Sequence, residues 1–156
     1  GCDPIKTWSN APASKLRDEV APHVHFAIYQ ALASPRLEIK RANAEALGNG
    51  VYKVEIGIAN TGWLGTEISE WAHKNKIVLP LTAEISGATL VEGAPRVKLG
   101  QLDGRVKFRV SGDAKSDGTP DRVLQSWLIR GEKGQRVTLT ATHQRAGVAS
   151  AVVELP

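Results

Sequence analysis

One ten-residue segment, in which large apolar residues recur at every second position, constrains the fold of this chain more than any other feature. The segment is VYKVEIGIAN, residues 51–60, and its alternating apolar members are Tyr52, Val54, Ile56 and Ile58. Successive side chains of a β-strand point to opposite faces, so this pattern predicts a strand with one buried face.

Similar segments of six to twelve residues precede and follow it, and short Gly- or Asp-containing turns separate most of them. The predicted strands are RLEIKRANAEAL (36–47), LTAEISG (81–87), ATLVEG (88–93), RVKLGQL (96–102), GRVKFRVSG (104–112), RVLQSWLIRG (122–131), QRVTLTATHQ (135–144) and VASAVVELP (148–156). Strands at this spacing with tight turns are typical of antiparallel sandwiches. The sequence therefore predicts a mainly β fold, an immunoglobulin-like or fibronectin-like β-sandwich of seven to nine strands over residues 36–156.

Residues 1–35 follow a different pattern and form a separate predicted segment. A Pro-, Asn- and Ser-rich lead-in precedes SKLRDEVAPHVHFAIYQALASP, residues 14–35. Its apolar residues recur at spacings of three and four, which predicts an amphipathic helix over 14–34. Ser14 is the expected N-cap and Pro35 the expected stop, whereas Pro22 is expected to kink or divide the helix.

Composition narrows the classes of function. The chain has 156 residues, 42% hydrophobic and 23% charged, with a formal net charge of +4. Basic residues are interleaved with acidic ones, which argues against nucleic-acid binding, and no apolar run approaches the roughly 20 residues of a membrane span. A single cysteine, Cys2, excludes an internal disulfide, and the lack of any methionine predicts a cut or processed start at Gly1.

No motif for catalysis or metal binding is recognisable in the sequence. His23 and His25 are two residues apart in a helical pattern, which places them on diverging faces. His73 and His143 have no ligand partner nearby and are expected at the surface, as are Glu67 and Glu70. We therefore expect no catalytic residue, no metal ligand and no cofactor in this chain.

The tryptophans are the strongest candidates for binding. Trp63 and Trp71, with Asn60 beside them, could stack on and hydrogen-bond to a sugar. The alternative is that both indoles close one end of the sandwich or pack on another domain. We expect the second case, with both rings at least half buried, and Trp127 in the core.

Several motifs carry a family resemblance. They are GCDP…W…N-x-P, L-x-S-P-R-L-E-I, V-x-I-G-I-A-N-T-G-W-L-G-T, V-x-L-G-Q-L-D-G-R and W-L-I-R-G-E-K-G. Together they resemble the C-terminal region of bacterial carboxypeptidase A-like zinc metallopeptidases, in which a β-sandwich follows the catalytic domain. Gly1-Cys2 departs from the pattern, which would place a bulkier residue before Asp3.

The resemblance implies a division of roles within a longer parent protein. Residues 3–34 would be the end of the catalytic domain, with Asp3 and Pro4 just after the strand that carries the catalytic glutamate. The zinc ligands would lie upstream, so zinc belongs to the parent and not to this chain. The implied function is a non-catalytic accessory domain of a periplasmic or secreted enzyme, with the upstream catalytic domain as its partner. The alternative is an independent β-sandwich module that binds a peptide, a cell-surface glycan or cell wall.

Overall fold

The computed structural model describes residues 12–67, 69–105 and 120–156. The lead-in with Cys2, Asp3 and Pro4, and most of the strand expected at 104–112, lie outside these described residues. The chain divides into two compact units, residues 1–33 and 34–156, which are described separately.

The first unit contains helix α1, Leu16–Leu32. It is shorter than predicted, because its N-cap is Lys15 without a side-chain cap and its C-cap is Ala33. Ser14 is therefore not the N-cap. Pro22 lies inside the helix and does not divide it. Leu16, Val20, Val24, Ile28 and Leu32, spaced four apart, are all exposed.

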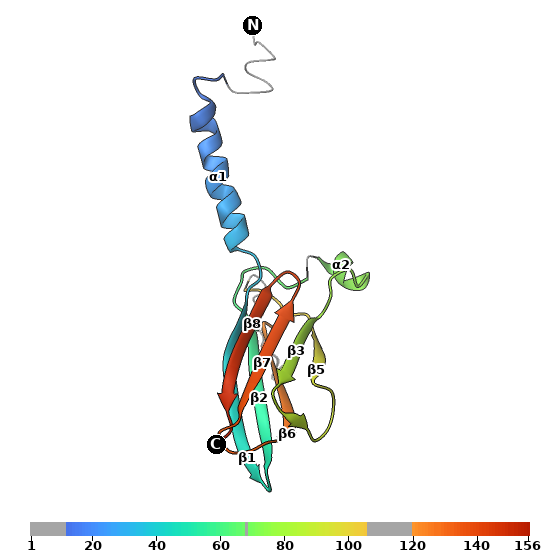
Figure 1. The fold of residues 1–156 in the computed structure, drawn as a ribbon. Coiled ribbons are helices and arrows are strands. Elements are labelled where there is room, and N and C mark those ends of the chain that lie inside the picture. Colours follow the sequence, from blue (N-terminus) through green and yellow to red (C-terminus); the bar gives the residue numbers. More distant parts are fainter. Residues whose placement is uncertain (1–11, 68, 106–119) are drawn as a thin grey trace, which may run out of the picture. The chain divides into compact units, whose positions relative to one another are not determined.

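The second unit is a β-sandwich of two antiparallel four-stranded sheets, as the alternating pattern predicted (Figure 1). The first sheet has the order β1-β2-β6-β4 and the second the order β5-β3-β7-β8. The strands are β1 (Leu37–Gly48), β2 (Val51–Asn60), β3 (Leu81–Ser86), β4 (Thr89–Leu90), β5 (Arg96–Gly100), β6 (Arg122–Arg130), β7 (Arg136–His143) and β8 (Gly147–Glu154).

The order of the long strands is that of the immunoglobulin fold. Strands β1, β2 and β6 correspond to A, B and E of one sheet, and β3, β7 and β8 to C, F and G of the other. The short strands β4 and β5 lie at the far edges. The turn between β1 and β2 needs three consecutive residues with positive φ, and Gly48-Asn49-Gly50 provides them.

The core lies between the sheets and is built from alternate residues of β2, β3, β6 and β7. Its fully buried members include Val54, Ile56, Ile58, Leu81, Ile129, Val137 and Leu139. Trp127 is 5% exposed, as predicted, and its indole N–H donates to the carbonyl oxygen of Ala94 at 3.2 Å. This bond ties the β4–β5 connection to the centre of the first sheet.

Trp127 gives a direct test of this core. We expect Trp127→Ala to lower the free energy of unfolding by about 3–5 kcal/mol, because it leaves a large cavity and an unpaired carbonyl. Leu124 lies on the same strand but is 55% exposed, so Leu124→Ala is the matched control. Urea unfolding of both variants measures the difference, and equal effects would contradict this packing.

Candidate functional site

Asn60 ends strand β2 and organises one end of the sandwich. Its amide oxygen accepts hydrogen bonds from the backbone N–H of Arg36 (3.0 Å) and of Gly62 (3.1 Å). Its amide nitrogen donates to the carbonyl oxygens of Leu64 (2.8 Å) and Asp103 (3.0 Å). The side chain is 1% exposed, and its two acceptor and two donor positions are all occupied. Asn60 therefore holds the backbone in place and has no free group for a ligand.

A second buried polar group lies at the same end. The Thr66 hydroxyl donates to Gln101 Oε1 at 2.7 Å and accepts the backbone N–H of Leu102 at 2.8 Å. Gln101 in turn donates to the carbonyl oxygens of Val78 and Leu79, each at 3.2 Å. The segment between β2 and β3, residues 61–80, is thus fixed near both of its ends by side chains from other parts of the chain.

His143 completes this network and corrects the sequence-based prediction that it lies at the surface. It is 2% exposed, because it continues the inward-facing row of β7 formed by Val137, Leu139 and Ala141. Its Nδ1 accepts the backbone N–H of Arg145 and of Ala146, so its proton is on Nε2, which donates to Gln101 Oε1 at 3.1 Å. Burial is the main cause that lowers the pKa of His143, and the charge of Arg145 adds to it. His143 is therefore held neutral as a structural group.

Of the two candidate tryptophans, Trp63 is half buried as expected and Trp71 is more open than expected. Trp63 is 50% exposed, and Trp71 is 68% exposed, so the prediction that Trp71 is at least half buried is wrong. The reason is local. Trp71 belongs to the one-turn helix α2, Glu70–Lys74, whose buried residue is Ala72, and adjacent helical positions point about 100° apart. Leu64, Ile77 and Leu79 of the same segment are also exposed, at 44%, 52% and 64%.

The backbone that carries Trp63 is closely packed. A Cβ atom added at Gly104 would lie 2.2 Å from the carbonyl oxygen of Trp63, and one added at Gly62 would lie 2.2 Å from that of Ser34. Only glycine allows these chain crossings. The backbone at Trp63 is thus fixed, and the segment that follows β2 and contains α2 lies at one end of the sandwich (Figure 1).

Four other titratable side chains of this segment lie in two pairs. His73 Nδ1 hydrogen-bonds to the Glu67 carboxylate, and the Lys74 ammonium lies 3.8 Å from the Glu70 carboxylate. The predicted exposure of His73 is confirmed by its 56% exposed side chain. Glu70 lies at the surface as expected, with its side chain 70% exposed, whereas the Glu67 side chain is only 17% exposed because it packs against His73.

A cavity of about 490 Å³ opens on the outer face of the second sheet, beside the start of β3. Leu79 and Pro80 line its apolar wall, and Arg96 and Lys98 of β5 supply positive charge. The Arg96 guanidinium donates to the Thr82 hydroxyl at 3.4 Å. His143 contributes to the wall, but its ring nitrogens are used internally.

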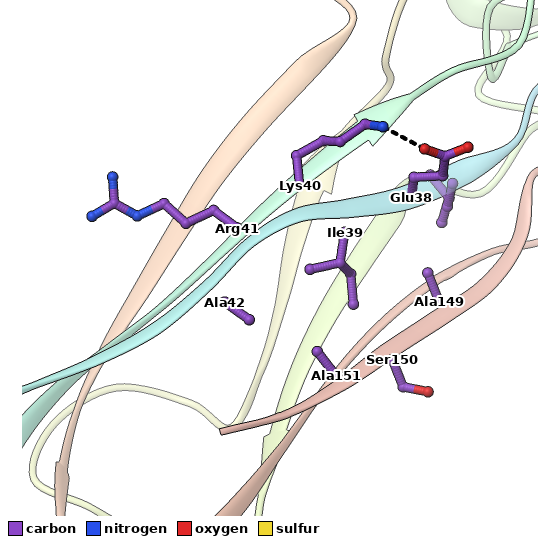
Figure 2. Close-up of a pocket in the computed structure, with 9 residues that line it drawn as sticks. Glu38, Ile39, Lys40, Arg41, Ala42, Ala149, Ser150 and Ala151 are labelled. Carbon is purple, nitrogen blue, oxygen red and sulfur yellow. Dashed lines mark hydrogen bonds and ion pairs between the residues drawn. The ribbon is translucent and has the colours of Figure 1, made fainter. Parts of the chain in front are cut away.

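A second, more open groove of about 510 Å³ runs between the edge strands β1 and β8. Figure 2 shows Ile39, Ala149 and Ala151 pointing into the groove and Ser150 pointing away from it. Glu38 borders it, and hydrogen bonds from Lys40, Thr61 and Arg36 lower the pKa of Glu38 to about 2. The groove walls are mixed, because Glu38, Lys40, Arg41 and Ser150 line it together with five apolar residues.

No group of three His, Cys, Asp or Glu residues within 12–67, 69–105 and 120–156 is placed to hold a metal ion. Neither helix in the same ranges is long and apolar enough to cross a membrane.

The comparison with known families gives a direct result. Residues 36–154 match a family described as a domain of unknown function, DUF8731. The chain belongs to the DUF8731 family. The matched residues begin just before β1 and end with β8, so the DUF8731 domain is the sandwich and α1 lies before it. None of the curated proteins compared with the chain matches it.

Removal of the Asn60 side-chain amide is predicted to lower the stability of the DUF8731 domain strongly. We expect Asn60→Ala to cost about 3 kcal/mol or more, because it leaves buried backbone N–H and carbonyl groups unpaired. Asn75 also donates to a backbone carbonyl, that of Trp71, but it is exposed. Asn75→Ala should therefore change the urea midpoint little, and comparable losses in both variants would contradict the role given to Asn60.

The burial of His143 predicts that the stability of the DUF8731 domain depends on pH. Its folded pKa is below the ordinary value of 6.5, so the unfolded chain binds more protons once the pH falls below that value. We expect the DUF8731 domain to lose stability as the pH falls from about 7.5 to 5.5, and His143→Gln to lose less over that range. Urea titrations of both proteins at each pH provide the measurement, and parallel losses would contradict this assignment.

Proposed function

We propose that this DUF8731 domain is a non-catalytic accessory module that docks onto another protein domain through the exposed apolar side chains of residues 61–80. The observation that carries the proposal is the exposure of Trp63, Trp71 and Leu79 on a segment that Asn60, Thr66 and Gln101 hold near its two ends. Large apolar side chains that lie together and stay exposed to solvent are typical of sites that bind another protein.

The partner we propose is the catalytic domain of a periplasmic or secreted zinc carboxypeptidase. The sequence motifs that resemble such enzymes support this choice, because in that arrangement the sandwich follows the catalytic domain. Zinc would be bound by the partner, and this chain would stabilise or position the catalytic domain. The exposed apolar row of α1 is in keeping with a segment that another domain covers.

A glycan-binding module is the second candidate, and the 68% exposure of Trp71 favours it. An open indole can stack on a sugar ring. Asn60 would not take part, because its amide is fully used within the domain. Trp63 and Trp71 would then provide stacking without that neighbouring amide.

Substitution of Trp71 tests whether its indole serves binding or contributes to the stability of the hydrophobic core. We expect Trp71→Ala to change the free energy of unfolding of the isolated chain by less than about 1 kcal/mol, because the ring is mostly exposed. The same substitution should weaken binding to the separately expressed catalytic domain by roughly tenfold or more, as for a hot-spot aromatic. Leu124→Ala, on the outer face of the first sheet, is the control and should leave binding unchanged.

The outcomes distinguish the candidates. Binding to purified cell-wall polysaccharide that is lost in Trp71→Ala, with no binding to a catalytic domain, would favour the glycan module. The coding sequence upstream of Gly1 gives an independent check, because the proposal requires an H-x-x-E motif and a distant third histidine there. Their absence would overturn the carboxypeptidase assignment.

A further inference from the structure

The cavity of about 490 Å³ on the outer face of the second sheet has a floor of short side chains. It lies where β5, β3 and β7 run side by side (Figure 1). Thr82 of β3 is opposite both Lys98 of β5 and Thr142 of β7, so the three residues form one row across the sheet. The two threonines are shorter than the lysine beside them. The hollow therefore follows from the residue types in this row.

Two cationic side chains lie on one side of the cavity. Arg96 and Lys98 are two residues apart on β5, so both point to the outer face of the sheet, and both are exposed. The Thr82 hydroxyl orients the first of them, because it donates to the carbonyl oxygen of Thr142 at 3.4 Å and accepts from the Arg96 guanidinium at 3.4 Å. The remaining guanidinium donors and the lysine ammonium make no hydrogen bond within the part of the chain that the structure describes. They are available to an anion.

The charge of this pair is not neutralised by a neighbouring carboxylate. None of the described residues that line the cavity is acidic. Glu84 is opposite Arg96 in the register of β3 and β5, but it does not line the cavity, and no ion pair joins the two side chains. Lys98 likewise forms no ion pair with any described residue. An anion in the cavity would therefore be attracted by both cations.

An irregularity in β5 shapes this edge of the sheet. Leu81 is opposite Gly100. The next residue, Thr82, is opposite Lys98, so Leu99 is an extra residue in β5. Gly100 has a φ of 81°, a conformation that glycine adopts readily. Such bulges increase the local twist, redirect neighbouring side chains and are common beside binding sites.

The adjoining wall of the cavity is apolar. Leu79, which is 64% exposed, and Pro80 form it. His143 adds to the wall, and its ring nitrogens are bonded within the domain. The cavity thus joins an apolar wall to two cations, and its volume lies within the roughly 300–1,000 Å³ typical of cavities that take small molecules.

We propose that this cavity binds a small organic anion in which a carboxylate is attached to an apolar body. The carboxylate accepts hydrogen bonds from Arg96 and Lys98, which are the side chains that pair best with such a group. The apolar body packs against Leu79 and Pro80 over the threonine floor, and this burial adds to the affinity. The ligand is a free molecule, so the site goes beyond the docking proposed for residues 61–80.

An NMR titration of the isotope-labelled whole chain with phenylbutyrate tests the proposal. We expect the backbone amide signals of Thr82, Lys98 and Thr142 to shift, with a dissociation constant of about 0.1–1 mM for a ligand of this size. Phenylbutyramide has the same apolar body without the charge and should bind about tenfold more weakly or less, because it cannot pair with the two cations. Acetate, which lacks the apolar body, should also bind about tenfold more weakly or less.

Substitution of the two cations tests their role directly. Arg96→Gln and Lys98→Gln should each weaken phenylbutyrate binding by about fivefold or more. Both variants should leave the weak binding of phenylbutyramide nearly unchanged, whereas a collapsed cavity would reduce the binding of both compounds. Arg130→Gln is the matched control, because it removes the same charge from an exposed position of β6 in the first sheet, and it should bind phenylbutyrate like the unmodified chain.

Several results would overturn the proposal. They are the absence of shifts at about 10 mM phenylbutyrate, equal binding of the acid and the amide, shifts confined to other parts of the domain, and unchanged binding in both variants. The amide spectra also verify that each variant is folded. None of these results affects the docking proposed for residues 61–80, because no partner domain takes part in the titration.

Discussion

The side-chain amide of Asn60 is the interaction on which one whole end of the sandwich depends. It joins the start of β1 through Arg36, the end of β2, the residues 62–64 and the loop at Asp103. A buried amide with all its hydrogen-bonding positions used is stable only in one arrangement of these chains, because each displaced chain would leave an unpaired buried group. The network of Thr66, Gln101 and His143 extends the same constraint toward β3 and β7.

This constraint explains why apolar side chains can stay exposed on residues 61–80. A loop without internal anchors would turn Trp63 and Leu79 inward, since burial of such side chains is favourable. Here the backbone beside them is fixed by buried polar groups and by the close crossings at Gly62 and Gly104.

Errors in the sequence-based predictions have physical causes that can be named. A surface position is expected for His143 because no ligand partner lies nearby in the sequence, yet the period of two along β7 already places it in the row of Val137, Leu139 and Ala141. Trp71 was expected to be buried because it is large, yet its place in a single helical turn left Ala72 as the residue that faces inward. In both cases position within the element outweighed the chemical character of the side chain. The amphipathic pattern of residues 14–34 predicted α1 but not its cap, because local capping depends on backbone geometry that the residue types alone do not fix.

The sequence by itself determined the elements. Alternation in residues 51–60 and in the later segments fixed the strands, and Gly48-Asn49-Gly50 fixed the first turn, because these signals act between residues close together in the chain. Only the tertiary structure decided which strands became edges, which polar residues were buried and what each buried group bonded. Asn60 meets Asp103, and Gln101 meets His143, through contacts more than forty residues apart along the chain. Such pairings arise from the packing of two sheets, and no spacing in the sequence encodes them.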